Sequence, residues 1–202
     1  IARPYIGTSK DNFKRTPNRH DYALSPSSET YMDILKANSY DVECVGKIND
    51  IFNGVGVTHT QKTVSNIDGM NKTIELLSKD FKGLCFVNLV EFDSEYGHRR
   101  NPLGYAKCIE EFDIQLGEFI SKMHDDDLLM VTADHGNDPI HHGTDHTREM
   151  VPLLIYSKSI KNGRKLDNQL SFACIGRTVI ENFNLKPNNQ IGDVLTEVLE
   201  DE

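Results

Sequence analysis

Carboxylate and imidazole side chains crowd into two segments near the middle of the chain. EFDSEYGHRR occupies 91–100, and ADHGND at 133–138 is followed closely by GTDHTRE at 143–149. Zn²⁺ and Mn²⁺ take this mixture of oxygen and nitrogen ligands. The adjacent Asp134 and His135 can diverge towards two ions, and two ions about 4 Å apart can hold both the attacking and the leaving oxygen of phosphoryl transfer. These residue types favour a metal site for phosphoryl transfer, although a single Asp–His pair after a strand is more typical of a turn that caps a helix.

Apolar runs of strand length stand directly before the two acidic segments. One run covers 84–90, another covers 128–132, and a third lies at 151–156. Strands without alternation are buried on both faces, which predicts an α/β fold class with a mostly parallel sheet sandwiched by helices. Open sheets of this kind bind ligands at the carboxyl ends of their strands, where both acidic segments fall. A further strand is expected at 41–45, and helical spacing predicts helices at 27–35, 71–79, 103–123, 172–183 and 193–199.

The composition narrows the classes of partner. Among 202 residues, 31 are acidic and 22 are basic, which gives a net charge of −9. That balance argues against a nucleic-acid partner, and no apolar run approaches the roughly 18 residues of a membrane helix. The four cysteines are scattered without short spacings, which favours free thiols and a cytoplasmic location.

Several ordered motifs resemble one known family. They are RTPNRHDYAL, VGKINDIF, NIDGMNKTIE, FDSEYGHRR, VTADHGNDP and GTDHTRE followed by VPLL. Together they resemble the phosphopentomutases of the alkaline phosphatase superfamily, from residue 1 to about residue 156 and more weakly beyond. The shorter DHGN element is shared more widely, including with cofactor-independent phosphoglycerate mutases. The resemblance implies an alkaline-phosphatase-like core.

The resemblance also implies an activity. Phosphopentomutases are isomerases that interconvert ribose 1-phosphate and ribose 5-phosphate, and the deoxyribose equivalents, in nucleoside salvage. Their site holds two Mn²⁺ ions, and a phosphorylated threonine exchanges its phosphoryl group with the sugar phosphate through a sugar bisphosphate that also acts as activator. A pentose phosphate is therefore the expected substrate. Zn²⁺ would suit the same ligands, and the oligomeric state is left open.

Carried onto this sequence, the resemblance assigns ligands to two ions. Asp134 and His135 would come from one strand end. The other ion's ligands would be Asp93, His98 and His146. The residues expected to orient His146 are Asp145, Thr147 and Arg148.

Basic residues in two of the motifs are candidates for the substrate. Lys47, Arg15 and Arg19 look like sugar-phosphate contacts, because Arg offers phosphate a planar fork and Lys a point charge. A basic residue in a loop is also often merely solvated. His141 and His142 are best interpreted as exposed loop residues, and whether they touch metal is left open.

By the resemblance, the family's N-terminal portion, with a metal-ligand aspartate and the threonine nucleophile, is expected to be missing from this chain. The sequence opens on Ile1, and no nucleophile is assigned. We expect residues 1–26 to be a remnant of an inserted cap domain and 27–202 to be the second half of the metal-binding core, incomplete at the N-terminus. Such a chain is expected to be inactive by itself.

Two alternatives stay open beside the mutase. One is a related metal-dependent phosphoglycerate mutase or phosphoesterase. The other is a non-catalytic, metal-binding half-domain. Because imidazole must be neutral to bind a metal ion, a metal-dependent activity is expected to fall on acidification.

Overall fold

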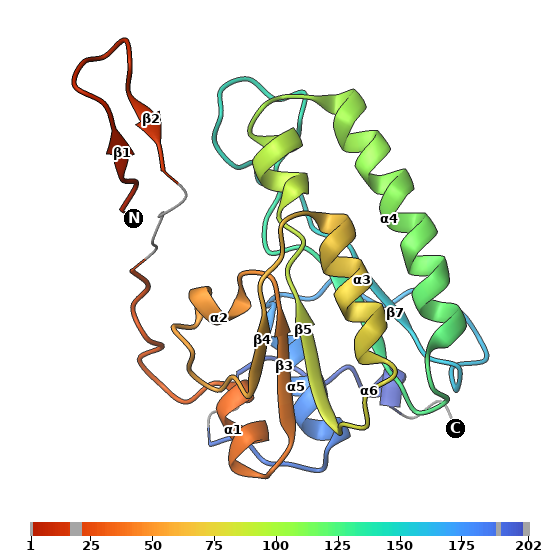
Figure 1. The fold of residues 1–202 in the computed structure, drawn as a ribbon. Helices are drawn as coiled ribbons and strands as arrows, with labels where there is room; N and C mark the ends of the chain where they lie inside the picture. The colour runs from red at the N-terminus through yellow and green to blue at the C-terminus, as the bar shows by residue number, and fades with distance from the viewer. Residues whose placement is uncertain (1, 17–21, 189–190, 200–202) are drawn as a thin grey trace.

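A computed structural model describes residues 2–16, 22–188 and 191–199. Its main sheet has three parallel strands in the order β4-β3-β5, namely β4 (His59–Gln61), β3 (Asp41–Val45) and β5 (Gly83–Val87). Figure 1 shows this sheet packed among helices, so the predicted α/β class is confirmed. The sequence predicted β3 and β5, but it missed β4, because three largely polar residues carry no strand pattern.

A second ladder pairs the later strands in the opposite sense. β6 (Leu129–Thr132) and β7 (Leu153–Tyr156) are antiparallel, with Leu129 opposite Tyr156. No crossover helix separates them, so the chain returns beside β6 in the opposite direction. The predicted burial on both faces is also wrong for β7, because the Leu154 side chain is 61% exposed. An unbroken apolar run does not reveal which of its faces is covered.

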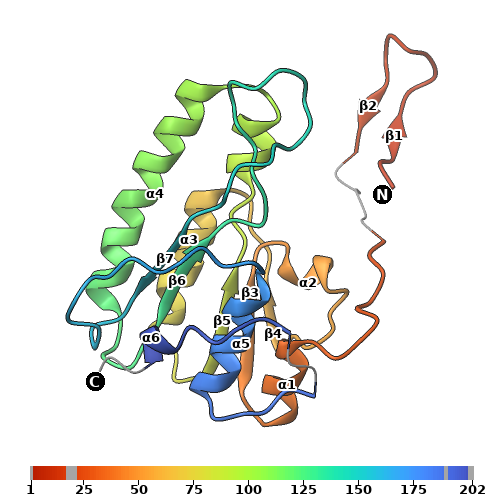
Figure 2. The same cartoon turned by 180° about the vertical axis from the view of Figure 1, so that it is seen from behind.

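Helices flank the main sheet on both sides. Figures 1 and 2, seen from opposite directions, show α3 (Asn66–Leu76) on one face and α5 (Ala173–Asn182) on the other. The long α4 (Pro102–Lys122) packs along α3. α3 begins five residues earlier than predicted, because Ser65 caps it by accepting a hydrogen bond from the backbone N of Asp68 at 3.1 Å.

The remaining helices are short. α1 (Tyr31–Ala37) begins with a reciprocal capping box between Thr30 and Asp33. α2 (Ile48–Ile51) follows β3, and α6 (Thr196–Leu199) ends the described chain. The sequence predicted α1 but not α2, and it predicted a longer α6. Across the described residues, no helix is both long and apolar enough to cross a membrane.

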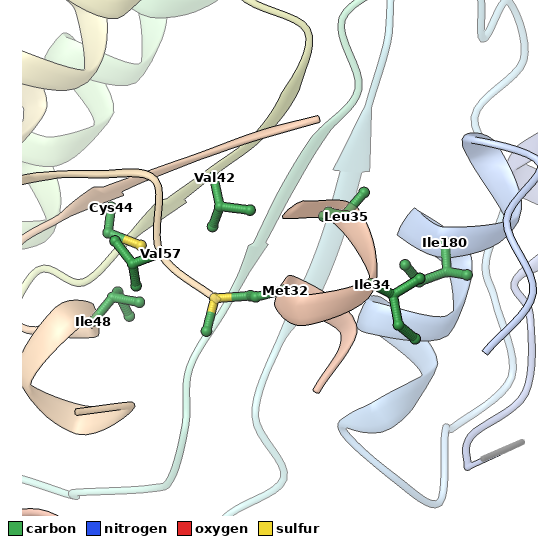
Figure 3. Packing of buried hydrophobic residues seen from close by; sticks show 8 residues of the cluster. All are labelled: Met32, Ile34, Leu35, Val42, Cys44, Ile48, Val57 and Ile180. Carbon is green, nitrogen blue, oxygen red and sulfur yellow. The ribbon is translucent and has the colours of Figure 1, made fainter. Parts of the chain in front are cut away.

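The core joins α1 to the central strand. β3 is the strand whose side chains are buried on both faces, from Val42 to Val45. Figure 3 shows side chains of α1, β3, α2 and α5 packed together with Val57, which lies between α2 and β4. It labels Met32, Ile34, Leu35, Val42, Cys44, Ile48, Val57 and Ile180. This packing holds β3 in place. It thereby helps to position the carboxyl ends of the parallel strands, where β5 leads into the first acidic segment.

A small antiparallel ribbon lies near the N-terminus. β1 (Tyr5–Ile6) pairs with β2 (Lys14–Arg15). Figure 1 shows the ribbon standing apart from the main sheet. The assignment of residues 1–26 to a cap domain and 27–202 to a core stays a prediction.

Candidate metal centre

The first group of candidate ligands lies on an unusually wide helical turn. β5 leads into η1 (Phe92–Gly97), a π-helical segment in which the backbone N of His98 donates to the Asp93 carbonyl at 2.9 Å. Bonds between residues five apart bring Asp93 and His98 onto one side of the turn. Their side chains approach to 3.4 Å between Asp93 Oδ2 and His98 Nε2. π-helical turns are rare and often occur at functional sites.

The second group follows β6. After Asp134 and His135 the chain makes a loop and returns, and a backbone bond from Thr147 N to the Gly136 carbonyl closes it at 2.9 Å. This closure brings His146 beside His135, with the ring centroids 3.7 Å apart and the planes 20° from parallel. Gly136 permits the approach, since a Cβ there would overlap with Glu149 Oε2 and lie 3.0 Å from the backbone N of Glu149 and the Thr147 carbonyl oxygen.

The two groups meet in one cluster. One ligand atom from each of Asp93, His135 and His146 lies within 4.8 Å of the others. His146 Nε2 is 3.2 Å from Asp93 Oδ1 and 3.1 Å from His98 Nε2. Carboxylate oxygen and imidazole nitrogen at this separation suit Zn²⁺ or Mn²⁺. Four of the predicted ligands therefore converge.

Asp134, the fifth predicted ligand, lies beside this cluster. Its Oδ1 is 3.7 Å from His135 Nε2, and its side chain is 73% exposed. The carboxylate is thus adjacent to His135 and open to solvent. That position is compatible with a second ion, but the ligand role of each residue stays a prediction.

Backbone carbonyls orient two of the imidazoles. His98 Nδ1 lies 2.5 Å from the Thr144 carbonyl oxygen, and His135 Nδ1 lies 3.1 Å from that of Gly136. A carbonyl oxygen only accepts hydrogen bonds, so each Nδ1 carries the hydrogen. In the neutral imidazole, which is the form that binds a metal ion, Nε2 then carries the lone pair.

Two residues absent from the predictions hold the cluster together. Asn137 Nδ2 donates to Asp93 Oδ1 at 2.7 Å, and Arg100 Nη1 donates to Asn137 Oδ1 at 2.7 Å. Asn137 could have been suspected because it belongs to the DHGND segment. Nothing in the sequence separates Arg100 from its neighbour Arg99.

The residues predicted to orient His146 make other contacts. Thr147 Oγ1 accepts from the backbone N of Asp138 at 2.7 Å and donates to Glu149. The Asp145 carbonyl accepts from Arg100 at 2.6 Å, and Arg148 is exposed. Within the described part of the chain, none of these three side chains forms a hydrogen bond or ion pair with the His146 ring. Their predicted role is untested.

The predicted phosphate contacts are only partly described. Lys47 is exposed two residues after the end of β3. The parallel strand β5 ends beside it, because Asn88 N donates to the Val45 carbonyl at 3.0 Å. Arg15 lies in β2, and only its backbone pairing is described. Arg19 falls outside the described residues.

Two further histidines lie in the loop that closes the site. His141 and His142 are exposed, with ring centroids 4.2 Å apart, and they are not part of the Asp93 cluster. Their exposure agrees with the interpretation of both as exposed loop residues.

The cysteines are buried, or half-buried in the case of Cys85, and none belongs to the Asp93 cluster. Burial, with the Glu43 carboxylate nearby, raises the pKa of Cys44 to about 11 and that of Cys85 to about 12. Both thiols are therefore protonated at neutral pH, whereas a thiol binds metal as the thiolate. The candidate centre is built from oxygen and nitrogen donors.

Comparison with known proteins decides the family. Residues 6–187 match the Metalloenzyme superfamily. The chain belongs to the Metalloenzyme superfamily. This membership agrees with the metal-ligand chemistry of the cluster and confirms the resemblance from which the ligands were predicted.

Curated relatives of this metalloenzyme chain carry a more specific name. It is 55% identical over 200 residues to the phosphopentomutase of Clostridium botulinum strain Alaska E43, covering 98% of this chain and 50% of the relative. It is 56% identical over 194 residues to that of Clostridium perfringens strain ATCC 13124, covering 96% of this chain and 49% of the relative. The chain thus spans about half the length of the curated relatives it matches.

Solved structures support the fold. PH0037 of Pyrococcus horikoshii matches with a TM-score of 0.57 and 19% identity, over 77% of this chain and 52% of that one. A protein of the alkaline phosphatase superfamily from Vibrio parahaemolyticus matches with a TM-score of 0.57 and 22% identity, over 82% of this chain and 50% of that one. The metalloenzyme chain therefore shares the alkaline-phosphatase-like fold that the sequence predicted.

Proposed function

We propose that this chain is the metal-binding part of a phosphopentomutase, an isomerase that interconverts ribose 1-phosphate and ribose 5-phosphate and the deoxyribose equivalents. The observation that carries the proposal is the convergence of Asp93, His98, His135 and His146 in a chain about half as long as phosphopentomutases to which it is 55% identical. Nucleoside salvage in the cytoplasm is the setting we propose with it.

The donor set fits a pair of divalent ions. Asp93, His98 and His146 would hold one ion, and Asp134 with His135 would hold the other. Mn²⁺ is the proposed metal, with Zn²⁺ as the alternative, because both accept carboxylate and imidazole ligands. When bound, such ions neutralise phosphate charge and lower the pKa of an attacking hydroxyl.

The chain's own residues contribute binding and orientation. His98 and His135 each donate Nδ1–H to a carbonyl, which keeps Nε2 directed at the centre. Lys47, at the same edge of the sheet, would attract the substrate phosphate as a point charge, and Arg15 and Arg19 are the other proposed contacts. The threonine nucleophile would lie in a part of the whole enzyme that this chain does not supply, and a sugar bisphosphate would serve as activator.

The test is conversion of ribose 1-phosphate to ribose 5-phosphate by the full-length protein, with Mn²⁺ and a catalytic amount of sugar bisphosphate. His146→Ala is expected to lower kcat/KM at least about 100-fold, which corresponds to about 2.7 kcal/mol of transition-state stabilisation. His124→Ala is the matched control. His124 is an exposed histidine whose Nδ1 lies 3.6 Å from Asp127 Oδ2, and it precedes β6, whereas the candidate ligands Asp134, His135 and His146 follow that strand.

The outcomes separate the alternatives. Conversion that depends on His146 and not on His124 supports the mutase. Turnover of 3-phosphoglycerate with no turnover of ribose phosphates would favour a phosphoglycerate mutase, and simple release of phosphate would favour a phosphoesterase. The 202-residue chain, run alongside, is expected to bind metal without turnover.

A further inference from the structure

We propose that Arg100 is a positioning residue of the metal centre, which fixes the loop between His135 and His146 and aims Asn137 at Asp93. The inference rests on the proposed metal site and goes beyond it, because Arg100 was predicted neither as a ligand nor as a substrate contact. Three independent features of the described structure carry it.

The first feature is the number of acceptors that the Arg100 guanidinium reaches. Arg100 reaches five acceptors, at 2.6 to 3.1 Å, all within η1 or the loop after β6. Nη1 shares its two hydrogens among three of them, and Nε and Nη2 each donate to one. The acceptors are the carbonyl oxygens of Gly97, Asp138, Gly143 and Asp145 and the side-chain oxygen of Asn137. Three of these carbonyls belong to the segment 138–145, which joins His135 to His146. A planar fork with several fixed donors can clamp such a loop, whereas a single ammonium cannot satisfy the same set.

The second feature is a relay through Asn137. Its Oδ1 accepts from Arg100 at 2.7 Å, so its amide nitrogen faces Asp93 Oδ1, also at 2.7 Å. That same carboxylate oxygen lies 3.2 Å from His146 Nε2. The orientation of the candidate ligand is therefore set by Asn137, and the orientation of Asn137 is set by Arg100.

The third feature is the local backbone. Arg100 has φ of +50°, a left-handed conformation that non-glycine residues seldom adopt and that costs about 1 kcal/mol or more. Gly97 makes room for the relay, because a Cβ there would lie 2.5 Å from Asn137 Nδ2. The turn holds Arg100 in an unfavourable conformation where its side chain reaches the loop.

Arg99 provides a matched control on the adjacent residue. It forms an ion pair with Glu95 at 2.9 Å and donates to the Ser94 carbonyl at 3.3 Å. Its side chain is 64% exposed, and exposed pairs of this kind contribute little to stability. Removing Arg99 changes the charge as much as removing Arg100, but it leaves the loop contacts intact.

The experiment titrates the metal-free full-length protein with Mn²⁺. Arg100→Ala, Arg100→Lys and Asn137→Ala are each expected to weaken Mn²⁺ binding about 10- to 100-fold, as loss of groups that orient metal ligands does elsewhere. Arg99→Ala is expected to match the wild type. The visible absorption of the Co²⁺-substituted protein should change with Arg100→Ala, because it reports ligand geometry, and should not change with Arg99→Ala.

A double variant tests the relay itself. If Arg100 acts through Asn137, the double variant Arg100→Ala with Asn137→Ala should bind Mn²⁺ with about the affinity of whichever single variant binds it less tightly. The inference would be overturned if the fold losses of Mn²⁺ affinity in the two single variants multiply in the double variant. It would also be overturned if both single variants keep the wild-type affinity. If circular dichroism shows that Arg100→Ala does not fold, Arg100→Lys and Asn137→Ala decide it. A wild-type protein that binds no Mn²⁺ would instead refute the proposed function.

Discussion

His98 and His146 present their Nε2 atoms to each other at 3.1 Å, although 48 residues separate them in the sequence. One ring stands at the end of η1, and the other stands on the strand-like return of the loop after β6. Asp93 lies within 3.4 Å of both imidazole nitrogens. Two imidazoles and a carboxylate that face one another in this way form a ready set of donors for a divalent cation.

Metal should stabilise the folded protein through these donors. At a free Mn²⁺ concentration about 100-fold above Kd, binding is expected to add about 2.7 kcal/mol to the free energy of unfolding. Urea unfolding of the full-length protein with and without a chelator measures this difference. Asp93→Asn should lose most of it, whereas His124→Ala should keep it. An equal gain in Asp93→Asn would place the bound metal elsewhere.

Metal affinity should also depend on pH. An imidazole must give up its proton to bind a metal ion, so protons compete with Mn²⁺ for His98, His135 and His146. The affinity of the full-length protein for Mn²⁺ is expected to fall progressively between about pH 8 and about pH 5, the range in which histidine changes charge. Titration calorimetry at several pH values measures it. A constant affinity over this range would be inconsistent with imidazole ligands.

Glycine at position 136 should matter for the site, and glycine at position 117 should not. A Cβ at Gly136 would overlap with Glu149 Oε2 and lie 3.0 Å from both the Glu149 N and the Thr147 carbonyl oxygen. A Cβ at Gly117, inside α4, has no neighbour within 4 Å. Gly136→Ala is expected to separate His135 from His146 and weaken Mn²⁺ binding about tenfold or more. Gly117→Ala should bind normally and gain about 0.5–1 kcal/mol in stability. Equal affinity in the two variants would refute this account of Gly136.

The buried thiols should make the protein sensitive to alkali. Burial raises the pKa of Cys44 from 9.0 to about 11, so folding favours the protonated thiol. The resulting stability is present below about pH 9 and is lost as the pH rises through 11. It amounts to at most about 3 kcal/mol. Urea unfolding at pH 8 and pH 10.5 should show a smaller alkaline loss in Cys44→Ala than in the wild type. Identical losses in both proteins would assign the effect to other groups.

Sequence patterns were sufficient where the cause of a structure is local. The spacing of Ile109, Phe112 and Leu116 predicted α4, and the apolar runs predicted β5 and β6, since periodicity and strand length depend on neighbouring residues. Helix caps are also local, but the sequence pattern did not predict that α3 begins as early as Asn66. The first turn of this helix carries few apolar residues. The antiparallel sense of β7 was missed, because pairing depends on how the chain returns.

The sequence by itself determined the family, through long ordered motifs, and the residue types available for a metal site. Only the tertiary structure decided that Asp93, His98, His135 and His146 meet while the Asp134 carboxylate faces solvent. It alone distinguished Arg100, whose guanidinium reaches five acceptors around the site, from Arg99 on the surface. The physical reason is that these contacts join segments some 40 residues apart, so they depend on the path of the chain between them.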